Sequence, residues 1–146
     1  MRAVADTNVV AYFLFGAEPF AGEARQFWDA VREPIAPVLR EAELANVVWM
    51  AIRSGVIEAH EGPKRLDLAA GLGGHSVPSR KLWHGALTRA VGSGTAAYDT
   101  LFVELAGRER LPRSRSSATS RGRRRRWGYK LGRLTGPRQS CDDGGR

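Results

Sequence analysis

The stretch Arg2-Ala3-Val4-Ala5-Asp6-Thr7-Asn8 decides the fold, because it passes from strand-like sequence to the start of a helix. Its apolar first half favours an extended backbone, whereas aspartate, threonine and asparagine favour the N-cap of a helix. The following Val9–Phe15 is too apolar for a surface helix, and it ends at Gly16. We therefore predict a strand, a tight turn and a short buried helix.

Short strand-like and longer helix-like segments alternate as far as Arg108. Two more short strands are predicted, at Glu33–Pro37 and around Ser76–Val77. Helices are predicted over Gly22–Arg32, from Pro37 to Arg53, over Glu58–Ala70 and Ser79–Val91, and from a Thr95 cap to about Arg108. This alternation predicts an α/β layered domain with a mainly parallel sheet.

Positive charge is concentrated at the end of the chain. Residues 1–106 hold ten Lys or Arg and twelve Asp or Glu, a balance of −2, whereas residues 107–146 hold thirteen and three, a balance of +10. Together they give the formal net charge of +8. The basicity that would suggest a nucleic-acid partner therefore belongs to the tail alone.

The composition argues against several classes of protein. Cys141 is the single cysteine, so we expect neither a disulfide framework nor a cysteine zinc site. Asp6 lies where a secretory signal would have its apolar core, and no apolar stretch approaches the roughly eighteen residues of a membrane helix. We expect a soluble, cytoplasmic protein with one domain and no membrane span.

Asp6 and Glu43 are carboxylates that a solvated surface explains poorly. Asp6 follows a strand and opens a helix, so it is expected at the carboxyl edge of the sheet, where ligands bind; a helix N-cap is the equally weighted alternative. Glu43 shares a helix stripe with Asn46 and would be partly buried. A buried carboxylate needs a basic partner, a raised pKa or a metal ion, and Arg40 is the alternative partner.

Asp99 is the third such carboxylate, in the first turns of the last helix. The helix dipole favours its ionised form there, with ordinary helix capping as the alternative. Three carboxylates at the ends of different elements suit Mg²⁺ or Mn²⁺ better than zinc, and such a site would activate water and stabilise charge on a phosphodiester. The histidines lie in separate segments and are interpreted as surface residues: His60, His75 and His84.

Three segments together resemble the PIN-domain family, and most closely its VapC-type toxins. They are Ala5-Asp6-Thr7-Asn8-Val9, Glu43-Leu44-Ala45-Asn46-Val47 downstream of Pro37, and Tyr98-Asp99-Thr100-Leu101-Phe102-Val103-Glu104-Leu105-Ala106. Their order and spacing over residues 3–112 carry the likeness. It implies a three-layer α/β/α fold and a ribonuclease toxin of a bacterial toxin–antitoxin pair that depends on Mg²⁺ (or Mn²⁺). Its partners would be an RNA substrate, a cognate antitoxin and a second copy in a homodimer.

The resemblance also implies roles for single residues. Asp6, Glu43 and Asp99 correspond to the catalytic, metal-binding acids. Thr7 and Asn8 correspond to polar residues that support Asp6, and Asn46 is expected to support Glu43 in the same way. The family continues, after sequence like Arg110-Leu111-Pro112, with a short strand and a Thr/Ser-x-Asp element that supplies a fourth acid. That element is missing here, because Arg113-Ser114-Arg115 begins a basic low-complexity segment.

The chain therefore divides into a PIN-like domain at residues 1–112, without its last strand, and a basic tail at residues 113–146 that we expect to be disordered. We interpret the abrupt change near residue 112 as a frameshift, with a nucleic-acid-binding tail and a solvated tail as alternatives. Loss of the fourth acid predicts weak or absent cleavage. The competing hypotheses are an inactive PIN-like protein that binds an antitoxin or RNA, and an α/β domain whose acids are only helix caps.

Overall fold

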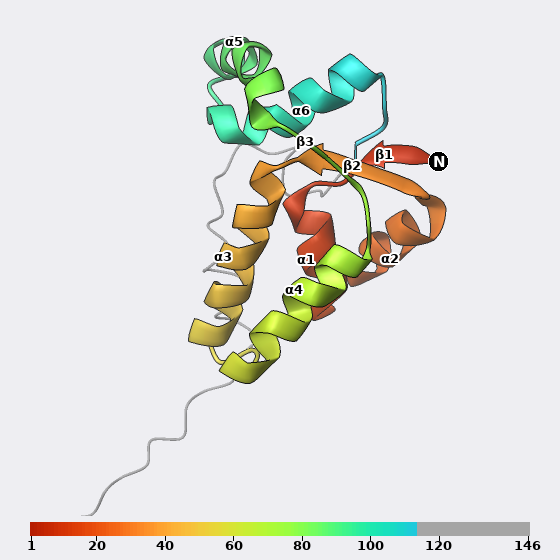
Figure 1. Ribbon diagram of the computed structural model, residues 1–146, viewed down its shortest axis with the longest axis vertical. Helices are drawn as coiled ribbons and strands as arrows, with labels where there is room; N and C mark the ends of the chain where they lie inside the picture. Colours follow the sequence, from red (N-terminus) through yellow and green to blue (C-terminus); the bar gives the residue numbers. More distant parts are fainter. Residues whose placement is uncertain (114–146) are drawn as a thin grey trace, which may run out of the picture.

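A short parallel sheet lies at the centre of the fold, as seen in a computed structural model that describes residues 1–113. Its strands are β1 (Arg2–Val4), β2 (Glu33–Pro37) and β3 (His75–Val77), in that order and all parallel (Figure 1). β2 pairs with β1 through its first three residues and with β3 through its last three. The two prolines of β2 have no N–H to donate, which limits the ladder to these short pairings. The three predicted strands and the parallel sheet are confirmed.

Helices cover both faces of this sheet (Figure 1). One face carries α5 (Trp83–Ser93) and α6 (Ala97–Glu109). The other carries α1 (Thr7–Phe15), α2 (Ala21–Ala30), α3 (Leu39–Arg53) and α4 (Gly62–Gly71). The described residues thus form an α/β fold of three layers, as predicted. None of the helices in residues 1–113 is both long enough and apolar enough to cross a membrane.

Each side of the sheet has its own apolar core. Val4 and Ile35 pack against residues of α6 on one side, including Phe102 and Leu105. The next residue of the chain, Ala5, packs with α1, α2 and α3 on the other side. Successive side chains of an extended segment point to opposite faces, so one short apolar strand supports both helical layers.

The helix α1 is buried, as its composition predicts. The buried side chains of this helix are Thr7, Val9, Val10, Ala11, Tyr12 and Leu14. It ends at Gly16, whose φ of 60° is a left-handed conformation that glycine adopts readily. The helix that positions the first candidate acid is therefore fixed by its own core contacts.

Some helix starts differ from the prediction. Pro37 ends β2 and is not in the first turn of α3. The pairing with β3 extends as far as Val38, whose N–H donates to the Val77 carbonyl, so the helix begins only after it. Ala96, and not Thr95, is the N-cap of α6, with no side-chain cap bond. Two predicted starts are separate 3-10 turns that precede α4 and α5: Ala59–Glu61 and Ser79–Lys81.

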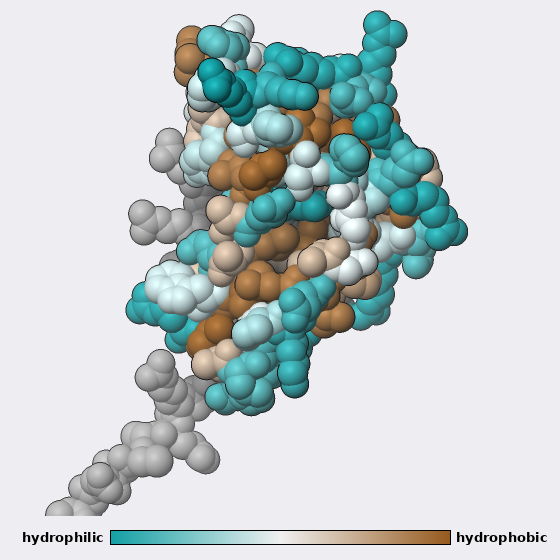
Figure 2. Space-filling view, in the orientation of Figure 1, coloured by the Kyte–Doolittle hydropathy of each residue, from teal (hydrophilic) through white to brown (hydrophobic). Residues whose placement is uncertain are grey.

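A third apolar cluster joins the end of α1 to the second half of α3 and to the segment that follows it. Val48, Ala51 and Ile57 are buried there, with Phe15 and Ile52 packed against them. Figure 2 shows apolar residues gathered over the region where α3 and α4 lie. Some large apolar side chains of these two helices are exposed: Trp49, Leu66 and Leu68.

After α6 the chain returns to the free edge of β1. The Val4 N–H donates to the Pro112 carbonyl at 2.9 Å, and Val4 forms a parallel bridge with Arg113. Arg113, which the sequence analysis assigned to the tail, thus contacts the sheet. The disorder and the frameshift predicted for the rest of the tail concern residues 114–146, which lie outside the described residues.

Candidate functional site

Asp6 lies directly after β1 and forms the N-cap of α1. Its Oδ1 accepts the Val9 N–H at 3.0 Å, and its side chain is 4% exposed. Burial raises the pKa of Asp6, and the Val9 N–H and Arg113 oppose this rise. The two interpretations of Asp6 are therefore compatible, since it caps a helix with one oxygen at the carboxyl edge of the sheet.

Glu43 lies on α3, half-buried, and its Oε2 accepts a hydrogen bond from the Thr7 hydroxyl. Burial raises the pKa of Glu43, the Thr7 hydroxyl lowers it, and the charges of Asp99 and Asp6 raise it further. The expected alternative partner, Arg40, is itself buried, and burial lowers its pKa. Within residues 1–113 no ion pair joins Arg40 or another basic side chain to Glu43.

Asp99 lies in the first turn of α6 with an exposed side chain. Its charge acts on Glu43 although the two residues are far apart in the sequence. The fold thus brings two of the candidate acids, Asp6 after β1 and Asp99 on α6, into electrostatic range of the third, Glu43 on α3. Among the described residues, no three acidic, histidine or cysteine side chains lie close enough together to hold a metal ion as they stand.

The predicted supporting residues differ in what they contact. The Thr7 hydroxyl binds Glu43 and not Asp6, so it joins α1 to α3 at the site. The Asn8 backbone N–H helps to lower the pKa of Asp6. Asn46 is exposed, and within the described part of the chain no hydrogen bond joins it to Glu43. The three histidines are exposed, as predicted.

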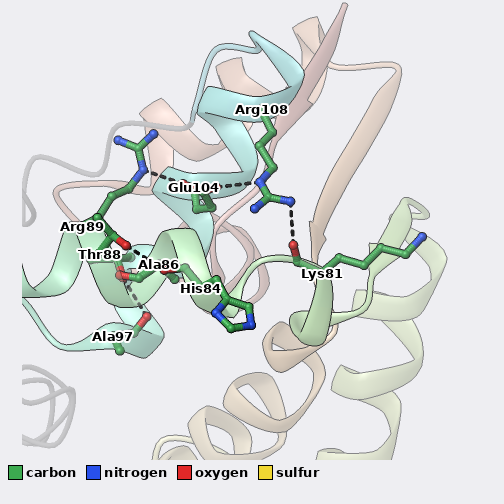
Figure 3. Close-up of polar contacts among 9 residues, drawn as sticks. Lys81, His84, Ala86, Thr88, Arg89, Ala97, Glu104 and Arg108 are labelled. Carbon is green, nitrogen blue, oxygen red and sulfur yellow. Dashed lines mark hydrogen bonds and ion pairs between the residues drawn. The ribbon is translucent and has the colours of Figure 1, made fainter.

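Glu104 is a second buried carboxylate, which the sequence analysis placed on the last helix without a role. Its Oε2 accepts from Arg89 Nε at 2.7 Å and its Oε1 from Arg108 Nε at 2.6 Å (Figure 3). These hydrogen bonds from Arg89 and Arg108 lower the pKa of Glu104. Arg108 also donates to the Lys81 carbonyl at 2.6 Å. This network ties α6 to α5 and is structural.

Arg113 lies at the candidate site, and the resemblance gave no indication of it. Its Nη2 lies 3.5 Å from Asp6 Oδ2, and its side chain is 23% exposed. A cavity of about 360 Å³ adjoins it, lined in part by Tyr12, Phe20 and Phe27. Scans of this chain against models of protein families and against curated proteins found no match.

Proposed function

We propose that this chain is a Mg²⁺- or Mn²⁺-dependent endoribonuclease of the PIN-domain type, with a weakened metal site. The observation that carries the proposal is the half-buried Glu43 carboxylate, which the Thr7 hydroxyl joins to the helix that Asp6 caps. Burial raises the pKa of Glu43, and the charges of Asp99 and Asp6 add to this rise. Carboxylates that repel one another destabilise a fold, and a divalent cation is a ligand that relieves this repulsion. Shifted carboxyl groups of this kind are concentrated at functional sites.

The kind of donor fits a hard cation. Asp6, Glu43 and Asp99 offer carboxylate oxygens, which Mg²⁺ and Mn²⁺ prefer to nitrogen or sulfur. Such a cation, when bound, would activate water and stabilise negative charge on a phosphodiester. The chain's own contribution is to hold the acids: the Val9 N–H fixes Asp6, and the Thr7 hydroxyl fixes Glu43.

In this proposal the protein is the toxin of a cytoplasmic toxin–antitoxin pair and forms homodimers. Support for a protein partner comes from α5, where Trp83, Leu87 and Val91 recur every four residues and all are more than half exposed. An apolar ridge of this kind is typical of an interaction surface. Sedimentation of the parent chain and of Leu87→Glu tests the homodimer. We expect the parent to sediment as a dimer and Leu87→Glu as a monomer; a parent chain that sediments as a monomer, like the variant, would contradict it.

The proposed activity is tested by cleavage of a structured RNA by the full chain in Mg²⁺, with Asp6→Asn as the matched control. Asparagine caps a helix about as well as aspartate, so this variant keeps the fold while losing a charged ligand. We expect weak cleavage by the parent and none by the variant. Equal cleavage by the two chains would exclude the metal mechanism.

Metal binding is tested separately by thermal unfolding with Mn²⁺. A cation that binds only the folded chain stabilises it by about 2.7 kcal/mol at a hundred times its Kd. Mn²⁺ should therefore raise the Tm of the parent and of Glu41→Gln, which changes an exposed acid of the same helix, but not the Tm of Glu43→Gln. Equal shifts in all three chains would contradict the site.

A second function, an inactive PIN-like protein that binds an antitoxin or RNA, is favoured by one observation. Within the described residues, the Arg113 guanidinium lies beside Asp6, at the carboxylate that a catalytic metal ion would need as a ligand. Mn²⁺ binding without RNA cleavage, together with retention of RNA by the parent chain in a filter assay, would select this alternative.

A further inference from the structure

The position of Arg113 is fixed by the backbone. The hydrogen bond from the Val4 N–H to the Pro112 carbonyl and the parallel bridge between Val4 and Arg113 hold this part of the chain beside β1. β1 leads directly into Asp6, so the guanidinium reaches the carboxylate from a neighbouring strand position. The contact therefore follows from the backbone pairing of Pro112 and Arg113 with Val4.

The two oxygens of Asp6 have different partners. Oδ1 accepts the Val9 N–H, whereas Oδ2 is paired with Arg113 Nη2. The carboxylate is almost completely buried, and an ionised carboxylate in such a place is stabilised by a nearby positive charge. Arg113 supplies that charge.

We propose that Arg113 competes with the divalent cation at the acidic site. Its guanidinium binds Asp6 Oδ2 and so lowers the affinity of the chain for the cation. This inference rests on the proposed function, because it concerns the same site. A guanidinium and a hard cation both seek the same carboxylate oxygen, and the cation must displace the guanidinium before Asp6 can serve as a ligand.

The test is the Kd of Mn²⁺ for the full chain, measured by calorimetry for the parent and for Arg113→Gln. Removal of a competing, charge-assisted contact of about 1 kcal/mol corresponds to a Kd about fivefold lower in the variant. Arg25→Gln is the matched control, because it removes one positive charge from an exposed position on α2. The double variant Asp6→Asn with Arg113→Gln should lose the gain.

The outcomes separate the two proposals. Tighter Mn²⁺ binding by Arg113→Gln alone supports the inference. Equal Kd values for the parent and Arg113→Gln, or an equal gain in Arg25→Gln, would overturn the inference and leave the metal site standing. No Mn²⁺ binding by any chain above that of Asp6→Asn would overturn the proposed function, and the inference with it. If Arg113→Gln does not fold, Arg113→Lys replaces it, with a gain of about twofold expected because lysine lacks the guanidinium fork.

Discussion

Glu43 and Glu104 are the same side chain in opposite surroundings. Glu104 accepts from two arginines, and its pKa is lowered, whereas Glu43 accepts from one hydroxyl near two other acids, and its pKa is raised. Burial is the largest cause of the raised pKa of Glu43, whereas at Glu104 the hydrogen bonds from Arg89 and Arg108 outweigh the effect of burial. The presence of basic partners therefore separates the two carboxylates. One carboxylate stabilises the fold, while the other costs stability that a bound cation would restore.

The largest effect should come from Glu104→Ala. The change leaves Arg89 and Arg108 without their shared carboxylate and opens space between α5 and α6, so we expect a loss of about 3 kcal/mol in the free energy of unfolding. Urea unfolding measures it. Glu109→Ala is the control, because Glu109 forms an exposed ion pair with Arg2 that should contribute less than about 1 kcal/mol. Equal losses in the two variants would show that the Glu104 network is not special.

Gly85→Ala should have the next largest effect on the same network. A Cβ at Gly85 would overlap the Glu104 carboxylate, whereas a Cβ at Gly92, on the same helix, would meet open space. We expect a loss of about 2 kcal/mol for Gly85→Ala from overpacking. Gly92→Ala should gain up to about 1 kcal/mol, since alanine favours a helix. Similar Tm values for the two variants would contradict the close packing of α5 on α6.

The acidic site should respond with the opposite sign and a smaller magnitude. In metal-free buffer at neutral pH, Glu43→Gln removes a charge that two neighbouring acids repel, so we expect a gain of about 1 kcal/mol in the free energy of unfolding. Glu41→Gln is the control on the same helix, where the exposed carboxylate accepts a hydrogen bond from the Ser76 hydroxyl. A loss of stability in Glu43→Gln would contradict the comparison.

The pH dependence sharpens this contrast. Because the pKa of folded Glu43 is raised above its ordinary 4.5, its penalty is full above the raised pKa and disappears as the pH falls towards 4.5. The gain of Glu43→Gln over the parent should therefore shrink on acidification. Glu104 has a lowered pKa, so its stabilisation is present above 4.5 and is lost as the pH falls through the lowered value. Denaturation curves of the parent, Glu43→Gln and Glu104→Gln between pH 7 and pH 3 check the two signs.

Local signals explain what could be predicted from the sequence. The three strands and the buried first helix follow from short apolar segments and from Gly16, and the cap at Asp6 follows from its place between a strand and a helix. The hydrogen bond between Thr7 and Glu43 joins residues that are 36 positions apart, so no local pattern predicts it. One of the two ion pairs of Glu104 could be predicted from the sequence, because Arg108 lies four residues away on the same helix. Its second arginine comes from another helix, which only the tertiary fold places there.

The order of the strands has a consequence for the chain as it leaves the ribosome. The sheet order β1-β2-β3 repeats the order of synthesis, so each strand finds its neighbour already made, and the sheet can be complete at Val77. One of its faces can then be covered by α1, while the opposite face stays exposed until Phe102 and Leu105 of α6 are made. The interval between residues 77 and 105 is thus the stage of synthesis at which a nascent chain leaves the apolar core on that face exposed, and a chaperone that binds apolar surface would act there.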